Sequence, residues 1–251
     1  ARVVVSNLDA KRTFTQIIDK NDLPLGIYEK AKNFKIRGSS GKVNIALSGL
    51  PKFSNVPDNA YVNRGGLELT GSLETMERAY DCWKRGRFSD DPYIEGVIPS
   101  AWDPTVAPPG KHWMSNFIQY CPAELADGPW TPEKRDLFGQ TVIDKIARYC
   151  PGFKDLIVHV EVRTPHEIEQ EIGLTEGNIF QGELTIDQLF FNRPFPGYAQ
   201  YRMPLKHLYM CGSSTHPGGG VSSACGANAA REILIDLKRP NSVPADDFYD
   251  E

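Results

Sequence analysis

Hydrophobic and polar residues follow regular spacings along most of the chain, and these spacings predict its elements. Apolar and polar residues alternate over Lys42–Pro51, which indicates a half-buried strand that ends at the glycine and proline of its last residues. Over Ser72–Phe88, apolar residues recur every three or four positions, which predicts an amphipathic helix. The segment Thr131–Phe153 opens with Thr-Pro-Glu and closes with Pro-Gly-Phe, so we predict a capped helix there.

Similar patterns predict the other elements in the middle of the chain. They are an irregular helical segment over 10–34, a strand within 65–72, two strands separated by a proline-rich loop over 93–122, a strand over 156–162 and a short capped helix over 164–173. Strands outnumber helices here, so the sequence predicts an α+β fold with mixed elements for this region.

The two ends of the chain differ from the middle. Val3–Val5 and Leu208–Cys211 are short continuous apolar runs, which is typical of parallel strands buried on both faces. Because segments far apart in sequence can share one sheet, we expect these strands to pair and the middle to form an inserted second domain. A buried strand at the very start also suggests that the chain begins inside a domain.

Composition excludes several classes of function. Apolar residues make up 40% of the chain and charged residues 24%, with 28 basic and 32 acidic residues giving a net charge of −4. No basic run indicates nucleic-acid binding, and no apolar stretch approaches the roughly 18 residues that span a membrane. The five cysteines are odd in number and widely spaced, which favours a reducing compartment: the cytoplasm or, in a eukaryote, the mitochondrial matrix.

A glycine-rich loop, Gly212–Gly220, lies between the last predicted strand and a predicted helix over Val221–Lys238. Small residues fill the first two turns of that helix, so another body can lie against its start. A helix N-terminus offers unpaired N–H groups and a partial positive charge, which together favour a phosphate or another electron-rich group.

Three other interpretations of this loop remain open. It is equally compatible with a tight surface connection before a packed helix. Cys225 or Ser214 is a candidate nucleophile with His216 as base, although the chain has no GxSxG elbow. Cys211, His216 and Cys225 also make a candidate zinc site, but their spacing matches no common pattern.

Several segments together resemble the phytoene desaturase-like flavoprotein family. They are LYMCGSSTHPGGGVSSACGANAA at 208–230, EGNIFQGELTIDQLFFNRPFPGYAQYR at 176–202, IPSAWDPTVAPPGKH at 98–112, NIALSGLP at 44–51 and VVVSNLDAKRTF at 3–14. The resemblance therefore spans nearly the whole chain. The family's GxGxxG strand–turn–helix, which holds the ADP half of FAD, has no counterpart in this sequence, so the chain resembles only the C-terminal half of such an enzyme.

The resemblance implies two domains. One is a Rossmann-type FAD domain built from both chain ends, and the other is a substrate domain of mixed sheet and helices that lies over the flavin. On this basis we expect remnants of the FAD domain at 1–12 and 204–238, a substrate domain at 13–203, and a flexible tail at 239–251. We also expect the N-terminal FAD-binding half as a partner, together with self-association into a homo-oligomer.

The resemblance further implies hydride transfer between an apolar substrate and FAD in the complete enzyme. The cofactor-binding residues would be Gly212, Ser213, Gly218, Gly219, Gly220, Val221 and Ser222. Where many flavoproteins carry an acidic residue after the last strand, this chain has Ser213 and Ser214. We expect FAD in the complete enzyme but not on this chain alone, and no metal. A non-catalytic module that binds a partner or an apolar ligand without flavin is the alternative.

Other side chains near the loop are weaker candidates. His216 is the candidate acid or base, and His112 a less favoured one. Tyr198, Tyr201 and Arg202 would line the substrate cavity. The remaining candidates have competing structural roles: Phe190 and Phe191 are better explained as core aromatics, and Arg193 or Arg202 as partners of an acid such as Asp187.

Overall fold

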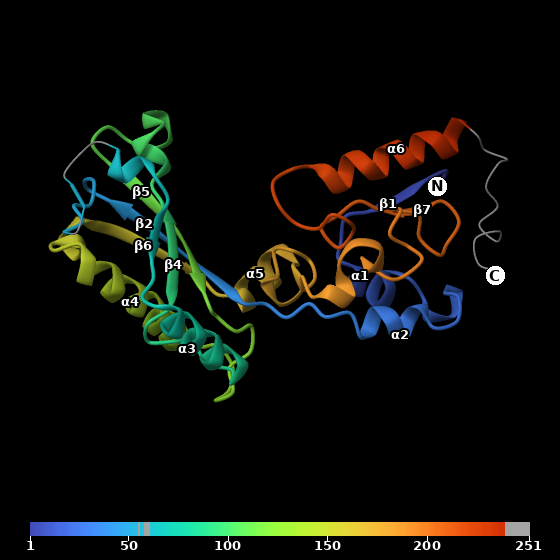
Figure 1. The fold of residues 1–251 in the computed structure, drawn as a ribbon, viewed down its shortest axis with the longest axis horizontal. Coiled ribbons are helices and arrows are strands. Elements are labelled where there is room, and N and C mark those ends of the chain that lie inside the picture. The colour runs from blue at the N-terminus through green and yellow to red at the C-terminus, as the bar shows by residue number, and fades with distance from the viewer. Residues whose placement is uncertain (55, 58–60, 239–251) are drawn as a thin grey trace. The chain divides into compact units, whose positions relative to one another are not determined.

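The computed structural model describes residues 1–54, 56–57 and 61–238, which divide into two compact units (Figure 1). The first combines Ala1–Arg37 with the part of the chain from Asn178 onward, and the second is Gly38–Gly177. The divisions thus fall at 37/38 and 177/178, not at the expected 12/13 and 203/204. Residues 14–36 and 195–210 share one hydrophobic core, which explains the larger first unit. The predicted tail at 239–251 lies outside the described residues.

The first unit is built on a parallel pair of strands from opposite ends of the chain. Strand β1 (Val4–Ser6) pairs with β7 (Leu208–Met210), with Val4 opposite Leu208 and Ser6 opposite Met210. Main-chain hydrogen bonds continue the pairing at both ends, from Val4 N–H to the His207 carbonyl and from Cys211 N–H to the Ser6 carbonyl, each 2.9 Å. The predicted pairing of the two chain ends is therefore confirmed.

Helices lie on both sides of this strand pair. On one side, α1 (Ala10–Arg12), a π-helical turn at Thr13–Ile17 and α2 (Ile27–Lys32) bury apolar residues against Leu208 and Met210 of β7. On the other side, α6 (Ala224–Lys238) runs alongside the strands, and the Asp236 carboxylate accepts a 2.7 Å hydrogen bond from the Tyr209 hydroxyl (Figure 1). Alternate residues of β7 therefore face opposite layers, as the pleat of a strand requires.

Strand β1 is not buried on both faces, contrary to the expectation from its sequence. Val4 and Val5 are 49% and 46% exposed, whereas all three residues of β7 are buried. Within the described residues β1 has β7 as its only strand neighbour, so one edge of β1 and part of its faces stay open. The apolar run predicted a strand correctly but not its surroundings.

The second unit contains an antiparallel sheet of five strands in the order β3-β4-β5-β2-β6. Its strands are β2 (Ser40–Leu47), β3 (Leu67–Leu69), β4 (Tyr93–Val97), β5 (His112–Gln119) and β6 (Ile157–Arg163). Its helices are α3 (Leu73–Lys84), α4 (Pro132–Tyr149) and α5 (Pro165–Ile172).

Helix α4 covers one face of this sheet. Phe138, Val142 and Ile146 on α4 pack in one core with the inward residues of β2, β4 and β5. The approach is close: a Cβ on Gly41 would lie 2.7 Å from the Phe138 ring, and one on Gly139 would lie 2.5 Å from a Val162 methyl. Glycine on both surfaces therefore lets the helix and the sheet approach closely. None of the helices described is long and apolar enough to cross a membrane.

Candidate cofactor-binding site

The glycine-rich loop leaves β7 at Cys211 and enters α6 at Ala224, entirely within the first unit. It begins with a tight turn, in which the Thr215 N–H and hydroxyl both donate to the Gly212 carbonyl, at 3.0 and 2.8 Å. A Cβ on Gly212 would lie 2.5 Å from the carbonyl oxygen of Asn7. Gly212 therefore lacks a side chain because the chain after β1 packs directly against it.

Two buried side chains, Ser214 and Cys225, hold the loop in place by hydrogen bonds to main-chain groups. The Ser214 hydroxyl accepts from the Ala10 N–H at 3.0 Å and donates to the Gln181 carbonyl at 2.5 Å. The Cys225 thiol donates to the carbonyls of Gly218 and Thr215, at 3.2 and 3.5 Å. Both candidate nucleophiles thus bind main-chain groups, and the His216 ring is a hydrogen-bond partner of neither.

The three consecutive glycines have different surroundings. Gly218 has a φ of +104°, and a Cβ there would lie 3.5 Å from Nε of Arg193. A Cβ on Gly219 would lie 2.3 Å from the ring of Phe180. Gly220 has a φ of +128° and no atom within 4 Å of its ideal Cβ position. Its side of the loop is open, so Gly220 is the glycine best suited to a close approach by a bound group.

Helix α6 begins at Ala224, three residues later than the sequence suggested. Ser223 has a φ of +58°, which is incompatible with a helix, and the first helical hydrogen bond runs from the Ala227 N–H to the Ser223 carbonyl at 3.0 Å. Val221 and Ser222 are exposed ahead of the helix. A Cβ on Gly226, in the first turn, would meet nothing within 4 Å. The helix N-terminus is therefore unobstructed.

His216 is half-buried, and its carbonyl accepts a 2.6 Å hydrogen bond from the Tyr201 hydroxyl. Its ring lies 6.2 Å from the ring of Phe190, measured between centroids. Phe190 and Phe191 are 60% and 79% exposed, so their assignment to the core was wrong. The nearby Arg193, by contrast, is fully buried.

The three residues predicted at a substrate cavity have protein partners. Tyr198 and Tyr201 are buried, and the Tyr201 hydroxyl also accepts from the Asn228 side chain at 2.8 Å. Arg202 makes a bidentate pair with Asp236, both contacts 2.8 Å, and a third contact to Glu232 at 2.7 Å. Whether these side chains also meet substrate stays a prediction.

The ion pair of Arg202 shifts the ionisation of its neighbours. Burial by itself would raise the pKa of Asp236, but hydrogen bonds from Arg202 and Tyr209 outweigh burial and lower it. Burial and the hydrogen bond to Asp236 raise the pKa of Tyr209 to about 12. Asp187, the acid suggested from sequence, pairs with Lys35 at 2.7 Å. Arg202 therefore links the segment before β7 to α6, and its acidic partners are Asp236 and Glu232 in place of Asp187.

The side chains that support the loop were either not singled out from the sequence, as with Phe180 and Gln181, or were given another role, as with Arg193. Phe180 lies against Gly219, and the Gln181 side chain donates to the Asn7 carbonyl at 3.1 Å. Arg193 binds the Ser213 carbonyl through two of its nitrogens, at 2.9 and 2.8 Å. The contacts of the 180–193 segment with the loop could not be predicted, because the two segments are distant in sequence.

No metal centre is present among the described residues. They contain no group of three or more His, Cys, Asp or Glu side chains that could hold a metal, and all five cysteines are free. The zinc-site interpretation is therefore not supported.

His112, the less favoured candidate acid or base, lies in the second unit. Its Nδ1 is 3.1 Å from the Ser100 hydroxyl oxygen.

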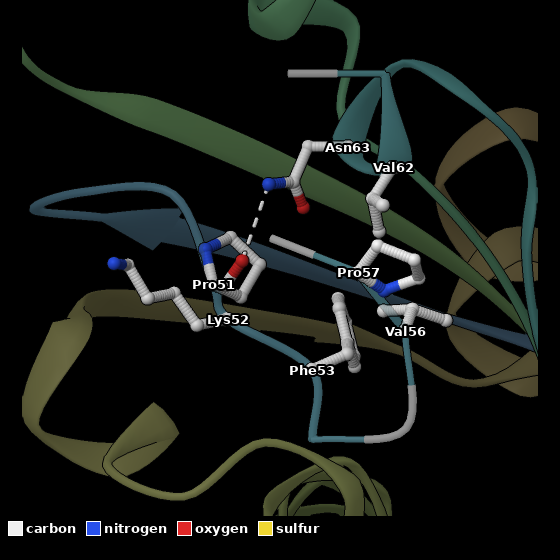
Figure 2. Close-up of a pocket in the computed structure, with 7 residues that line it drawn as sticks. All are labelled: Pro51, Lys52, Phe53, Val56, Pro57, Val62 and Asn63. Atoms are coloured by element: carbon white, nitrogen blue, oxygen red, sulfur yellow. Dashed lines mark hydrogen bonds between the residues drawn. The ribbon is translucent and has the colours of Figure 1, made fainter. Parts of the chain in front are cut away.

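A small pocket lies in the second unit, lined by Pro51, Lys52, Phe53, Val56, Pro57, Val62 and Asn63 (Figure 2). The Asn63 side-chain amide donates to the Pro51 carbonyl across one side of it at 3.2 Å (Figure 2). Its cavity volume of about 30 Å³ suits one or two water molecules. The pocket is too small for a flavin.

Known proteins of similar sequence support the family resemblance. The chain is 37% identical over 246 residues to pyridine nucleotide-disulfide oxidoreductase domain-containing protein 2 of Rattus norvegicus, covering 95% of this chain and 42% of the relative. It is 32% identical over 252 residues to one of the subunits of limonene dehydrogenase from Castellaniella defragrans (94% and 45% covered). It is 30% identical over 142 residues to a 4,4′-diapophytoene desaturase of Staphylococcus aureus (54% and 27% covered). These relatives confirm the resemblance to the phytoene desaturase-like flavoproteins.

The fold agrees with this resemblance. Cyclohexylamine oxidase from Brevibacterium oxydans superimposes with a TM-score of 0.54 at 13% identity, covering 95% of this chain and 44% of that structure. The expected combination of mixed sheet and helices from part of a two-domain flavoprotein is thus confirmed at the level of fold. No protein-family model matches the chain. The chain spans about 42% of the length of the relative from Rattus norvegicus.

Proposed function

We propose that this chain is part of a FAD-dependent oxidoreductase in which hydride passes between an apolar substrate and flavin. Bound FAD supplies the hydride acceptor or donor, and the protein supplies position and electrostatics. The first unit would contribute to the FAD domain, and the second would be the substrate domain. The adenosine half of FAD would be held by a GxGxxG segment, which this chain lacks.

The observation that carries the proposal is the open start of α6. Gly220 and Gly226 both face free space, on either side of the exposed residues Val221 and Ser222. A glycine in the first turn of a helix costs roughly 1 kcal/mol relative to alanine, so it needs a reason to be there. A bound group that lies against the loop and the helix start supplies such a reason, and in this proposal the group is the flavin.

Each residue of the loop would have its own part in holding the flavin. The backbone of Gly218–Gly220 would allow close approach, and the Val221 N–H would donate, since the Ser222 N–H already donates to the Gly220 carbonyl at 2.8 Å. The positive end of the α6 dipole favours the negative charge that reduced flavin carries. Of the two serines after β7, Ser213 is the one whose hydroxyl is available to a ligand, because the Ser214 hydroxyl is committed within the protein.

The substrate would be apolar. Two of the relatives are named for limonene and 4,4′-diapophytoene, both hydrocarbons. Exposed Phe190 lies beside His216, and together they offer an apolar surface with one group able to exchange a proton. His216 would be the acid or base. The free cysteines agree with a reducing compartment such as the cytoplasm or the mitochondrial matrix.

Flavin content tests this proposal. We expect the chain alone to be colourless and inactive, because it lacks the GxGxxG segment. We expect the longer protein, in which this chain is joined to such a segment, to carry one FAD per chain. The measurement is the visible flavin absorbance relative to the protein absorbance after gel filtration. A longer protein that is folded yet cannot be loaded with FAD would contradict the proposal.

A further inference from the structure

Among the described residues, Arg193 is the largest fully buried side chain, and it lies directly behind the glycine-rich loop. It sits in the first unit, at the end of the segment that runs from Phe180 to Asn192. An arginine side chain is almost never fully buried unless its charge and its donors are satisfied. The partners of Arg193 therefore indicate why it is there.

All five N–H donors of the guanidinium have main-chain carbonyls as acceptors. Nε donates to the Ser213 carbonyl at 2.9 Å, and one terminal nitrogen donates to the same oxygen at 2.8 Å. That nitrogen also contacts the carbonyls of Phe180 at 2.7 Å and Gly182 at 3.4 Å. The other nitrogen contacts the carbonyls of Glu183 at 3.2 Å and Gln188 at 3.3 Å. The guanidinium thus links the glycine-rich loop to the 180–188 segment.

No carboxylate among the described residues forms an ion pair with Arg193, and Glu183 pairs instead with Arg37 at 2.7 Å. Burial lowers the pKa of Arg193 to about 10, which still leaves it charged at neutral pH. The dipoles of the surrounding main-chain carbonyls stabilise this charge, and they do so only when the backbone directs the carbonyl oxygens toward the guanidinium. Loss of the cation would leave several buried carbonyls without a donor, which is costly.

The same contacts fix the open part of the loop. Nε of Arg193 lies 3.5 Å from the ideal Cβ position of Gly218, and the Phe180 ring lies against Gly219. Arg193 also donates to the Phe180 carbonyl. One side chain therefore fixes both the Ser213 backbone and the position of Phe180, which packs behind the glycines. Lysine cannot replace it, since an ammonium group has three donors where the guanidinium fork has five.

We propose that Arg193 is a positioning residue for the flavin: it holds the Gly218–Val221 backbone in the conformation that the cofactor meets. That the ligand is a flavin rests on the proposed function, whereas the effect of Arg193 on the loop does not. The guanidinium acts through the main chain of Ser213 and Phe180, and it does not itself contact the flavin.

Amide hydrogen exchange of this chain tests the effect on the loop without any cofactor. In Arg193→Lys, amides at 212–222 should exchange about tenfold faster or more, because at least two donors are lost. In Arg193→Ala, millimolar guanidinium should restore slow exchange and millimolar ammonium should not. That concentration is far below the molar range in which guanidinium unfolds proteins. Arg231→Gln, which removes an exposed charge from α6 in the same unit, is the control and should change nothing.

FAD affinity in the longer protein is the second readout. Arg193→Lys should weaken FAD binding about tenfold or more, and guanidinium should restore the affinity of Arg193→Ala. Unchanged loop exchange in Arg193→Lys overturns the inference, as does unchanged FAD affinity. Changed exchange in a longer protein that never binds FAD would instead refute the proposed function alone.

A wild-type measurement covers the case in which the variants do not fold. Since Arg193 joins 180–188 to 212–215, amides of the two segments should open with the same free energy as denaturant is raised. Separate opening of the two segments would overturn the inference without any substitution.

Discussion

The glycines between β7 and α6 lack side chains for different physical reasons. Gly212 and Gly219 have protein atoms where a Cβ would be, namely the Asn7 carbonyl and the Phe180 ring. Gly220 combines a positive φ with empty space, so it is the backbone conformation and not packing that requires glycine there. Substitution of Gly220 can therefore test for a bound group, whereas substitution of Gly212 or Gly219 would disturb the packing of the protein itself.

Asp236 is a second residue whose environment has a measurable consequence. We expect Asp236→Asn to lower the free energy of unfolding by about 1–3 kcal/mol near neutral pH, because the charged hydrogen bonds to Arg202 and Tyr209 are weakened. The folded pKa of Asp236 lies below its ordinary value, so its stabilisation is complete above that ordinary value, about pH 4. The stabilisation is lost as pH falls through the folded pKa.

Denaturant unfolding of wild type and Asp236→Asn at a series of pH values measures this effect. The difference in unfolding free energy should be constant between about pH 5 and 7 and shrink below about pH 4. Asp187→Asn, at an exposed pair with Lys35, is the control and should cost little at any pH. A difference for Asp236→Asn that grows on acidification would contradict the assignment.

At the scale of elements, local sequence signals predicted most of the fold. Helix α4 begins at Pro132, directly after the capping Thr131, and α5 has a full capping box between Thr164 and Glu167, with contacts of 2.9 and 3.2 Å. Each signal lies within a few residues of the element it defines. The start of α6 was placed three residues early because the left-handed Ser223 has no signature of its own.

Features that depend on distant contacts were not predictable from one sequence. An arginine after two phenylalanines gave no sign that Arg193 would be buried and Phe190 and Phe191 exposed. Arg193 is the buried side chain of this segment because carbonyls at 180–188 and at Ser213 accept its hydrogen bonds. These carbonyls come together only in the fold. For the candidate site, the sequence located the loop and the helix, while the side chains that support the loop required the structure.

Gly226→Ala separates the two interpretations of the start of α6. Alanine in the first turn should raise the unfolding free energy of this chain by about 0.5–1 kcal/mol, since it favours the helix and meets nothing within 4 Å. In the longer protein the added methyl group should weaken FAD binding, because it occupies the surface that the flavin would cover. Denaturant unfolding and FAD titration are the two measurements. A stabilised protein with unchanged FAD affinity would favour a simple connection before a packed helix.

At the scale of the whole molecule, the β1–β7 pair leaves apolar surface uncovered. Val4 and Val5 are about half exposed, and within the described residues β7 is the only neighbour of β1. Open edges with apolar residues favour association, so we expect this chain alone to form dimers or larger oligomers. Sedimentation velocity over a range of concentrations measures this, and Val5→Lys should reduce association. A strictly monomeric wild-type chain at high micromolar concentration would contradict the expectation.

Gly220→Val tests whether the loop between β7 and α6 holds flavin. Valine there would oppose the φ of +128° and fill the open space beside the helix start. Gly197→Val is the matched control in the same unit, since Gly197 has a φ of +89° and also no atom within 4 Å of its ideal Cβ position. Both variants are made in the longer protein, with circular dichroism to verify folding. We expect Gly220→Val to fold without FAD and Gly197→Val to keep full FAD occupancy. Full occupancy in Gly220→Val would contradict flavin binding by this loop.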